Sequence, residues 1–274
     1  MALIDLRRAE NITGNFFVDS SCIDCDLCRQ IAPATFRAVG EQSAVYHQPR
    51  TPDEEMAALK ALVTCPTASI GTTAKLDAKA AVRAYPELIA DEVFFCGFAA
   101  ESSFGAASYL IRRPEGNVLI DSPRFARPLA RQIEALGGVR WMFLTHRDDI
   151  TRRTANIERV VTGNKATPLA DDLLVIPTPG HTRGHAVLLY RNRFLFSGDH
   201  LWWSPTYQSL YASPNVCWYS WTAQTRSMER LLDYQFEWVL PGHGRRTHGT
   251  LAEMHNQLLD CVARMQARRT AVAE

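Results

Sequence analysis

The chain has 274 residues, 46% of them hydrophobic, which is enough apolar material for a sizeable core and for two domains. Thirty Lys and Arg residues nearly balance 29 Asp and Glu residues, so no overall field attracts nucleic acid or an anionic membrane. No apolar run approaches the length of a membrane span, and residues 1–10 lack the apolar centre of a signal peptide. We expect a cytoplasmic protein with no nucleic-acid or membrane partner.

Four of the seven cysteines form a pattern near the start of the chain. Cys22, Cys25 and Cys28 follow the spacing C-x-x-C-x-x-C, and Cys65 is followed directly by Pro66. Three thiolates at this spacing cannot share one helix face, but they can wrap around a cubic iron–sulfur cluster while a fourth arrives from elsewhere. In a reducing compartment such a group favours metal ligation over disulfides. Structural zinc is the alternative, although zinc ligands usually come in two separated pairs.

A helix is predicted between the third and fourth of these cysteines. Thr51 is its expected N-cap, Pro52 its first residue and Glu54 its capping-box partner, and the helix ends by delivering Cys65. This unit resembles the single-cluster bacterial-type ferredoxins, in which the fourth cysteine is also followed by proline. The resemblance implies a ferredoxin-like domain at residues 1–80 with one [4Fe–4S] cluster bound by the four cysteines. The remaining cysteines are expected to be buried as small apolar residues: Cys96, Cys217 and Cys261.

The next elements are read from apolar periodicity and turn residues. Residues 75–91 are expected to form a helical linker interrupted at Pro86, and the second domain is expected to span residues 92–274. Strands are predicted at 93–98, 106–113, 117–123, 141–145, 173–177, 186–190, 194–196 and 238–240. Helices are predicted at 125–136, 222–234 and 251–267. Residues 200–221 are expected to be irregular, with their many aromatic side chains used for packing rather than for a substrate site.

Four of the predicted strands are each followed closely by His or Asp. These residues are His146, His181, Asp199 and His243. Because strand ends are rigid, side chains in the loops that follow them can be held well enough to bind a metal. The sequence therefore predicts a metal site built from strand ends.

The motifs around these residues resemble the metallo-β-lactamase superfamily over about the last two-thirds of the chain. The matching motifs are PGHTRGH at 179–185, SGDH at 197–200 and PGHG at 241–244. The resemblance implies an αββα sandwich with metal ligands at one edge. The expected fold class is therefore α+β: a ferredoxin-like domain followed by a metallo-β-lactamase-type sandwich, shortened between His146 and His181.

The first metal-binding loop departs from the family pattern T-H-x-H-x-D-H. His146 matches the first ligand, Asp148 stands where the second His is expected, and Ile150 and Thr151 replace the Asp-His pair. Half of a second metal's ligands are therefore absent. The predicted metal ligands are His146, Asp148, Asp149, His181, Asp199 and His243.

Two imidazoles and one carboxylate are typical of mononuclear non-haem iron(II). His146, His181 and Asp199 supply this set. Within the superfamily that the chain resembles, persulfide dioxygenases bind one iron through the same three positions, which favours iron here. The expected cofactor is one iron or zinc ion, with manganese or an empty site as alternatives. His185 and His200 are expected to support the ligands rather than to bind metal.

Three functions remain open, and no catalytic residue is assigned. The first is a redox enzyme whose cluster passes electrons to a mononuclear iron, which acts on a small-molecule substrate. An electron-transfer partner would then supply the electrons to the cluster. The second is a metal-dependent hydrolase of an ester, thioester or amide. The third is a catalytically degenerate redox-sensing or partner-binding protein.

Overall fold

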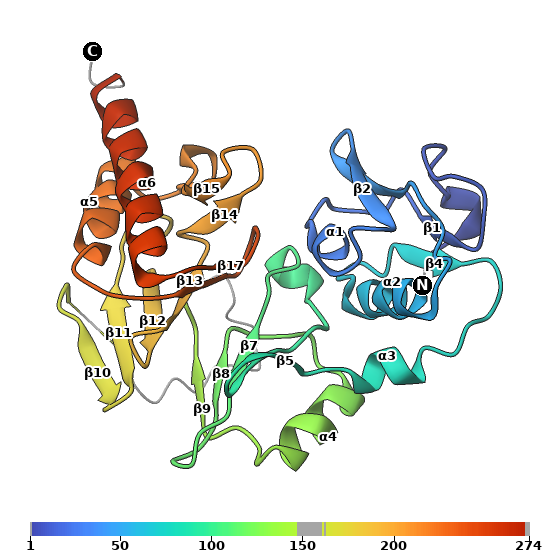
Figure 1. Ribbon diagram of the computed structural model, residues 1–274, viewed down its shortest axis with the longest axis horizontal. Coiled ribbons are helices and arrows are strands. Elements are labelled where there is room, and N and C mark those ends of the chain that lie inside the picture. The colour runs from blue at the N-terminus through green and yellow to red at the C-terminus, as the bar shows by residue number, and fades with distance from the viewer. Residues whose placement is uncertain (1, 147–160, 162, 272–274) are drawn as a thin grey trace. The chain divides into compact units, whose positions relative to one another are not determined.

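A computed structural model describes residues 2–146, 161 and 163–271 (Figure 1). The chain divides into two compact units, Met1–Met142 and Phe143–Glu274. The domain boundary expected between residues 80 and 92 stays a prediction, because a division into compact units does not show where one domain family ends and the next begins. Within the described part of the chain, no helix has both the length and the apolar character needed to cross a membrane.

The first unit begins with short elements around the cysteine motif. In chain order they are η1 Ile4–Leu6, β1 Phe16–Val18, α1 Leu27–Ile31, β2 Phe36–Val39, β3 Gln42–Val45, α2 Pro52–Thr64 and β4 Ile70–Thr72. Strand β1 pairs with β4 and β2 pairs with β3, both antiparallel. Helix α2 starts as predicted, because Thr51 Oγ1 accepts from the Glu54 amide at 3.2 Å. The Glu54 side chain in turn accepts from the Arg50 amide at 2.7 Å, which completes the cap one residue earlier than a standard capping box.

The rest of the first unit is a five-stranded sheet with two helices. Its strands, in spatial and chain order, are β5 Glu87–Ala90, β6 Val93–Phe95, β7 Tyr109–Ile111, β8 Val118–Ile120 and β9 Trp141–Phe143. The other elements are α3 Lys79–Arg83, η2 Glu101–Ser103 and α4 Arg127–Ala135. The helical linker predicted for residues 75–91 is wrong in its second half, because β5 pairs antiparallel with β6. Pairing with β6 makes this segment a strand. Its own sequence shows little alternation of buried and exposed residues, because β5 lies at the edge of the sheet and even Leu88 is 56% exposed.

The second unit is a six-stranded sheet in the order β10-β11-β12-β13-β16-β17. Its strands are β10 Thr167–Ala170, β11 Leu173–Pro177, β12 Ala186–Tyr190, β13 Phe194–Gly198, β16 Trp238–Pro241 and β17 Thr247–His248. Strands β11, β12 and β13 are antiparallel neighbours, whereas β13 and β16 are parallel. The carboxyl ends of β11, β13 and β16 consequently lie at the same edge of the sheet.

Helices α5 Trp221–Leu231 and α6 Leu251–Ala271 pack on one face of this sheet (Figure 1). Alternate strand residues and one stripe of each helix form the buried core. Its members include Ile176, Val187, Leu189, Leu195, Val239, Met228, Leu231, Met254, Leu258 and Met265. This core gives the sheet edge a rigid base that does not depend on any bound ion.

The expectations for residues 200–221 and for Cys217 need correction. The segment expected to be irregular contains a hairpin, β14 Trp202–Ser204 with β15 Ser209–Tyr211, and a short 3-10 turn η5 Pro214–Val216. The aromatic residues there are not all packed inward, since Trp218 is 63% exposed. Cys217 is half-buried rather than buried, whereas Cys96 and Cys261 are buried as predicted.

Candidate cluster and metal sites

The four motif cysteines of the first unit line one cavity. Cys22 and Cys25 lie in the loop before α1, Cys28 lies within α1, and Cys65 caps the end of α2. Helix α1 has only five residues, and two of the three cysteines of the triplet precede it. The sequence therefore places all four thiols where one cluster can be held.

Backbone and side-chain donors approach these sulfurs. The Ser43 amide donates to Cys22 Sγ at 3.4 Å, and the Ser69 amide donates to Cys65 Sγ at 3.3 Å. Cys28 Sγ lies 3.2 Å from Ser43 Oγ. Amide donors aimed at thiolate sulfur stabilise the negative charge of an iron–sulfur cluster, so the donor set fits a [4Fe–4S] cluster.

Burial makes these thiols hard to ionise without a metal. It is the main cause that raises the pKa of the Cys25 thiol to about 12, and it also raises the pKa of the Cys28 thiol. The backbone amide of Leu27 opposes the shift at Cys25 by donating to its sulfur. Because the ligand form is the thiolate, metal binding at this cavity must release protons.

The loops of the five-stranded sheet close over the cysteine segment within the same unit. Arg124, which follows β8, donates to the carbonyl oxygens of Cys65 at 2.8 Å and Val63 at 2.6 Å. At Gly105, with φ of +82°, a Cβ atom would lie 2.7 Å from Cys25 Cβ, so only glycine permits this approach. Neither residue carries a sequence signal for a cluster site, and sequence reasoning missed both.

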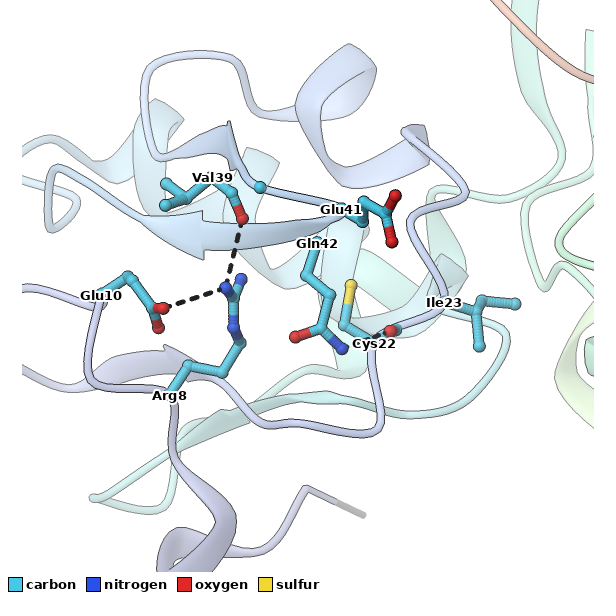
Figure 2. Close-up of a pocket in the computed structure, with 8 residues that line it drawn as sticks. Arg8, Glu10, Cys22, Ile23, Val39, Glu41 and Gln42 are labelled. Atoms are coloured by element: carbon cyan, nitrogen blue, oxygen red, sulfur yellow. Dashed lines mark hydrogen bonds and ion pairs between the residues drawn. The ribbon is translucent and has the colours of Figure 1, made fainter.

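A second cavity, of about 520 Å³, opens beside Cys22 (Figure 2). Figure 2 shows the Arg8 guanidinium inside it, donating to the Val39 carbonyl at 3.2 Å and paired with Glu10 at 3.3 Å. Apart from its chain neighbours, no heavy atom of the described residues lies within 4 Å of the position that a Cβ would take at Gly40, so this rim is open. The cavity leaves the Cys22 side of the cysteine group accessible.

The second unit gathers its candidate ligands at the shared edge of β11, β13 and β16. His181 lies in the loop after β11, Asp199 directly follows β13, and His243 lies just beyond β16. His146 follows β9, and its neighbour Thr145 accepts from the Ala186 amide at 2.9 Å at the start of β12. Four residues that follow strand ends therefore converge at this edge.

One potential ligand atom from each of His146, His181 and Asp199 lies within 4.8 Å of the others. Nε2 of each histidine lies 3.6 Å from Asp199 Oδ2, and the two rings meet edge to face with centroids 5.0 Å apart. All three side chains are buried. Asp199 Oδ1 is buried and accepts no hydrogen bond from the described residues, which leaves acceptor capacity for a cation.

The partners of Nδ1 orient both imidazoles. Nδ1 of His146 lies 3.0 Å from Thr145 Oγ1, and Nδ1 of His181 hydrogen-bonds to the Val216 carbonyl. A carbonyl oxygen can only accept, so His181 carries its proton on Nδ1 and presents a lone pair at Nε2. This is the arrangement in which a histidine binds metal, and the residues present therefore fit one metal ion.

Two glycines allow the strand ends to pack closely around the aspartate. A Cβ at Gly198, with φ of +51°, would lie 2.6 Å from Thr145 Oγ1. A Cβ at Gly242 would lie 2.7 Å from Asp199 Oδ1. The glycines of the SGDH and PGHG motifs thus make room for the site rather than only turning the chain.

His185 and His200 form a buried imidazole pair behind the ligands. Their rings stack with centroids 5.0 Å apart, and His185 Nδ1 lies 2.8 Å from Thr178 Oγ1. Burial lowers the pKa of His200 to about 3, and it also holds the pKa of His185 well below its usual range. Both rings are therefore neutral at neutral pH, as supporting rather than charged groups.

His243 and Trp218 lie at the solvent side of the site. His243 Nε2 is 3.8 Å from Asp199 Oδ2, and its side chain is 33% exposed. The ring centroids of Trp218 and His181 are 4.6 Å apart, and the backbone amide of Trp218 donates to the His181 carbonyl at 3.0 Å. Sequence reasoning missed Trp218, which a tryptophan-rich loop alone does not single out. The other predicted ligands, Asp148 and Asp149, lie outside the described residues.

Comparisons with known proteins bear on both units. Residues 18–72 match the family model described as "4Fe-4S single cluster domain of Ferredoxin I", and this segment contains all four cavity cysteines. The predicted ferredoxin-type domain is therefore confirmed. A search of curated proteins found no match.

Solved metallo-β-lactamases are similar to the chain in fold. TMB-1 is 16% identical, with a TM-score of 0.47, and covers 66% of this chain and 97% of its own. The metallo-β-lactamase from Pontibacter korlensis is 16% identical, with a TM-score of 0.44, covering 65% of this chain and 97% of its own. A metallo-β-lactamase family protein from Thermus thermophilus is 20% identical, with a TM-score of 0.39, covering 61% and 76%. The described elements themselves combine helices and sheets, as the expected α+β class requires.

Proposed function

We propose that the protein is a redox enzyme that uses a [4Fe–4S] cluster and one iron ion to act on a small molecule. The proposed cluster ligands are Cys22, Cys25, Cys28 and Cys65. The proposed iron ligands are His146, His181 and Asp199. The observation that carries the proposal is the buried set of two imidazoles and one carboxylate, whose ligand atoms lie within 4.8 Å of one another.

This donor set favours iron over the alternatives. When bound there, iron would supply one-electron chemistry and keep coordination positions open for a small substrate. The Val216 carbonyl holds His181 in the metal-binding tautomer, and burial excludes bulk water from the carboxylate of Asp199. His243 is partly exposed, and its Nε2 lies 3.8 Å from Oδ2 of the same carboxylate.

The cavity beside Cys22 is the proposed approach for an electron-transfer partner. Its lining includes Cys22 itself, and Glu41 and Gly40 form part of its open rim. Charges at the rim of a contact change association rates more than affinity. Glu41→Lys should therefore change the bimolecular rate of cluster reduction by a charged donor, with the effect fading at high salt.

A reducing compartment such as the cytoplasm fits this function. None of the seven cysteines is paired as a disulfide. Oxidising conditions would compete for the same sulfurs that the cluster requires.

Metal content after anaerobic purification tests the assignment. The wild-type chain should carry four iron atoms for the cluster and one more. Asp199→Asn and His181→Ala should lose only the additional iron, Cys25→Ser should lose only the cluster iron, and His255→Ala, an exposed control on α6, should lose neither. Zinc in place of the additional iron would favour the hydrolase, and cluster iron alone would favour the sensing protein.

Electron transfer between the two centres needs a separate measurement. The protein is first oxidised, then reduced with limiting equivalents through the cluster, and the mononuclear ferric signal is followed by electron paramagnetic resonance. In the wild type this signal should disappear. In Cys25→Ser it should persist, and loss of the signal in both proteins would refute feeding by the cluster.

A further inference from the structure

A cavity of about 250 Å³ lies in the second unit, away from the residues assigned to the metal. It is formed by the β14–β15 hairpin, the start of α5 and one side of α6, elements that Figure 1 shows grouped in this unit. Its principal lining side chains are Tyr207, Tyr211, Trp221, Cys261, Arg264 and Arg268. Neither the cluster nor the metal site makes use of them.

The lining of this cavity is positively charged. Two guanidinium groups, Arg264 and Arg268, contribute to it, and no Asp or Glu does. Arg268 reaches the Tyr211 hydroxyl at 3.5 Å, and within the described part of the chain no ion pair involving either arginine is found. Burial raises the pKa of the Cys261 thiol to about 11, so this side chain supplies no compensating anion at neutral pH.

Two buried N–H donors at the cavity have no acceptor among the described residues. Arg264 donates through Nη2 to the Leu210 carbonyl at 2.7 Å, but its Nε remains without an acceptor. Nε1 of Trp221 likewise has no acceptor among the described residues. A buried donor without an acceptor is costly, and native structures usually satisfy such groups with protein, water or ligand atoms.

The walls of the cavity are flat and apolar. The rings of Tyr207 and Tyr211 stack with centroids 4.6 Å apart and an interplanar angle of 18°. The Arg264 guanidinium carbon lies 5.8 Å from the Tyr207 ring centroid, and Met265 completes the apolar lining from α6. Such a surface favours a planar apolar body over a branched or strongly hydrated one.

We propose that this cavity is a binding site for an aromatic carboxylate, with its carboxylate at Arg264 and Trp221 and its ring against the stacked tyrosines. The volume suits a ligand of roughly a dozen non-hydrogen atoms. The carboxylate accepts from the two N–H groups that lack acceptors, and the arginines supply the charge. The site is separate from the proposed redox function and does not depend on it.

The test is calorimetric titration of the purified holoprotein with 2-naphthoate, with neutral 2-naphthalenemethanol as the matched probe. Naphthoate should bind with a Kd of about 1 mM or tighter. The neutral alcohol should bind roughly tenfold more weakly, because it lacks the charge that the arginines recognise. No saturable naphthoate binding, or equal binding of the two probes, would overturn the proposal.

Variants locate the binding. Arg264→Gln should weaken naphthoate binding roughly tenfold or more, and Arg268→Gln, at an exposed position that does not threaten folding, roughly threefold. Arg226→Gln, on an exposed face of α5, should have no effect. Binding should survive in Asp199→Asn, since a ligand held by the metal site would be lost there. Unchanged affinity in both lining variants, or loss of binding in Asp199→Asn, would contradict the assignment.

Discussion

The cysteine cavity of the first unit and the histidine–aspartate site of the second differ in what holds their ligands in place. The cysteines lie in a loop, a one-turn helix and a helix cap, surrounded by strands of only three or four residues. The histidines and the aspartate lie at the edge of a six-stranded sheet whose core is covered by two long helices. One site is built from irregular backbone, and the other rests on regular structure.

The difference implies opposite relations between metal and folding. Where the ligands come from a loop, a short helix and a helix cap, the bonds to the cluster hold these segments together, so the cluster stabilises the fold around it. Where the ligands project from a packed sheet, the site is formed before the metal arrives. The cluster should therefore be structural as well as functional, and the single metal ion should be dispensable for folding.

Loss of one cluster ligand should produce the largest effect. Cys25→Ser should abolish the visible absorption of the cluster and unfold the surroundings of α1, because the bonds that tie the cysteine loop to α1 and to the end of α2 are gone. Absorption spectra and hydrogen exchange by mass spectrometry measure the two consequences. Cys96→Ala, at a buried cysteine of the same unit outside the cavity, is the control and should keep the colour. A colourless Cys25→Ser protein with unchanged exchange would show that the cluster is not structural.

Loss of one metal ligand should affect binding but not folding. Asp199→Asn should weaken iron binding by more than about 100-fold, since even changes to the hydrogen-bonded neighbours of ligands cost 10 to 100-fold. The melting temperature of the apo-protein should not fall, because the carboxylate faces the two imidazoles of the site rather than apolar core residues. Metal titration and thermal melting by circular dichroism check both statements. Unfolding of the variant would show that the two sites do not differ in this respect.

Acid should destabilise the second unit through its buried imidazoles. The pKa of His200 is about 3 in the folded protein, against an ordinary value of 6.5, so the unfolded chain binds the extra proton between these values. Stability is thus complete above pH 6.5 and falls as the pH decreases toward 3, by up to ~1.4 kcal/mol per pH unit for this residue. Urea denaturation of the apo-protein between pH 4 and 7 measures the slope. His200→Gln should reduce it by about one proton, and an unchanged slope would exclude this residue as its source.

The smallest expected effect concerns Arg124, which binds the Cys65 carbonyl without being a ligand. Removing a positive charge near the cluster disfavours its reduced form, so Arg124→Gln should lower the reduction potential by on the order of 50 mV while the cluster stays bound. Protein-film voltammetry measures the potential. Arg112→Gln, which removes an exposed guanidinium paired with Glu92, should leave it unchanged. Equal potentials for wild type and Arg124→Gln would limit Arg124 to a structural role.

The sequence by itself determined where ligands can arise. The cysteine triplet is local, so its spacing alone lets three sulfurs face one point. Cys65 follows a helix whose N-terminus is predicted by the capping residues Thr51 and Glu54. His181, Asp199 and His243 were predictable because each follows an apolar strand. Such signals are carried by residues close together in the chain.

Tertiary structure alone decided the features that depend on pairing between distant segments. Strand β5 exists because β6 lies beside it, and the hairpin β14–β15 was hidden in an aromatic-rich segment. The tautomer of His181 is set by the Val216 carbonyl, far along the chain. Arg124 and the cavity beside Arg264 acquire their roles from backbone carbonyls and side chains that only folding brings near. Local sequence encodes local geometry, whereas hydrogen-bond partners and cavities belong to the packed arrangement.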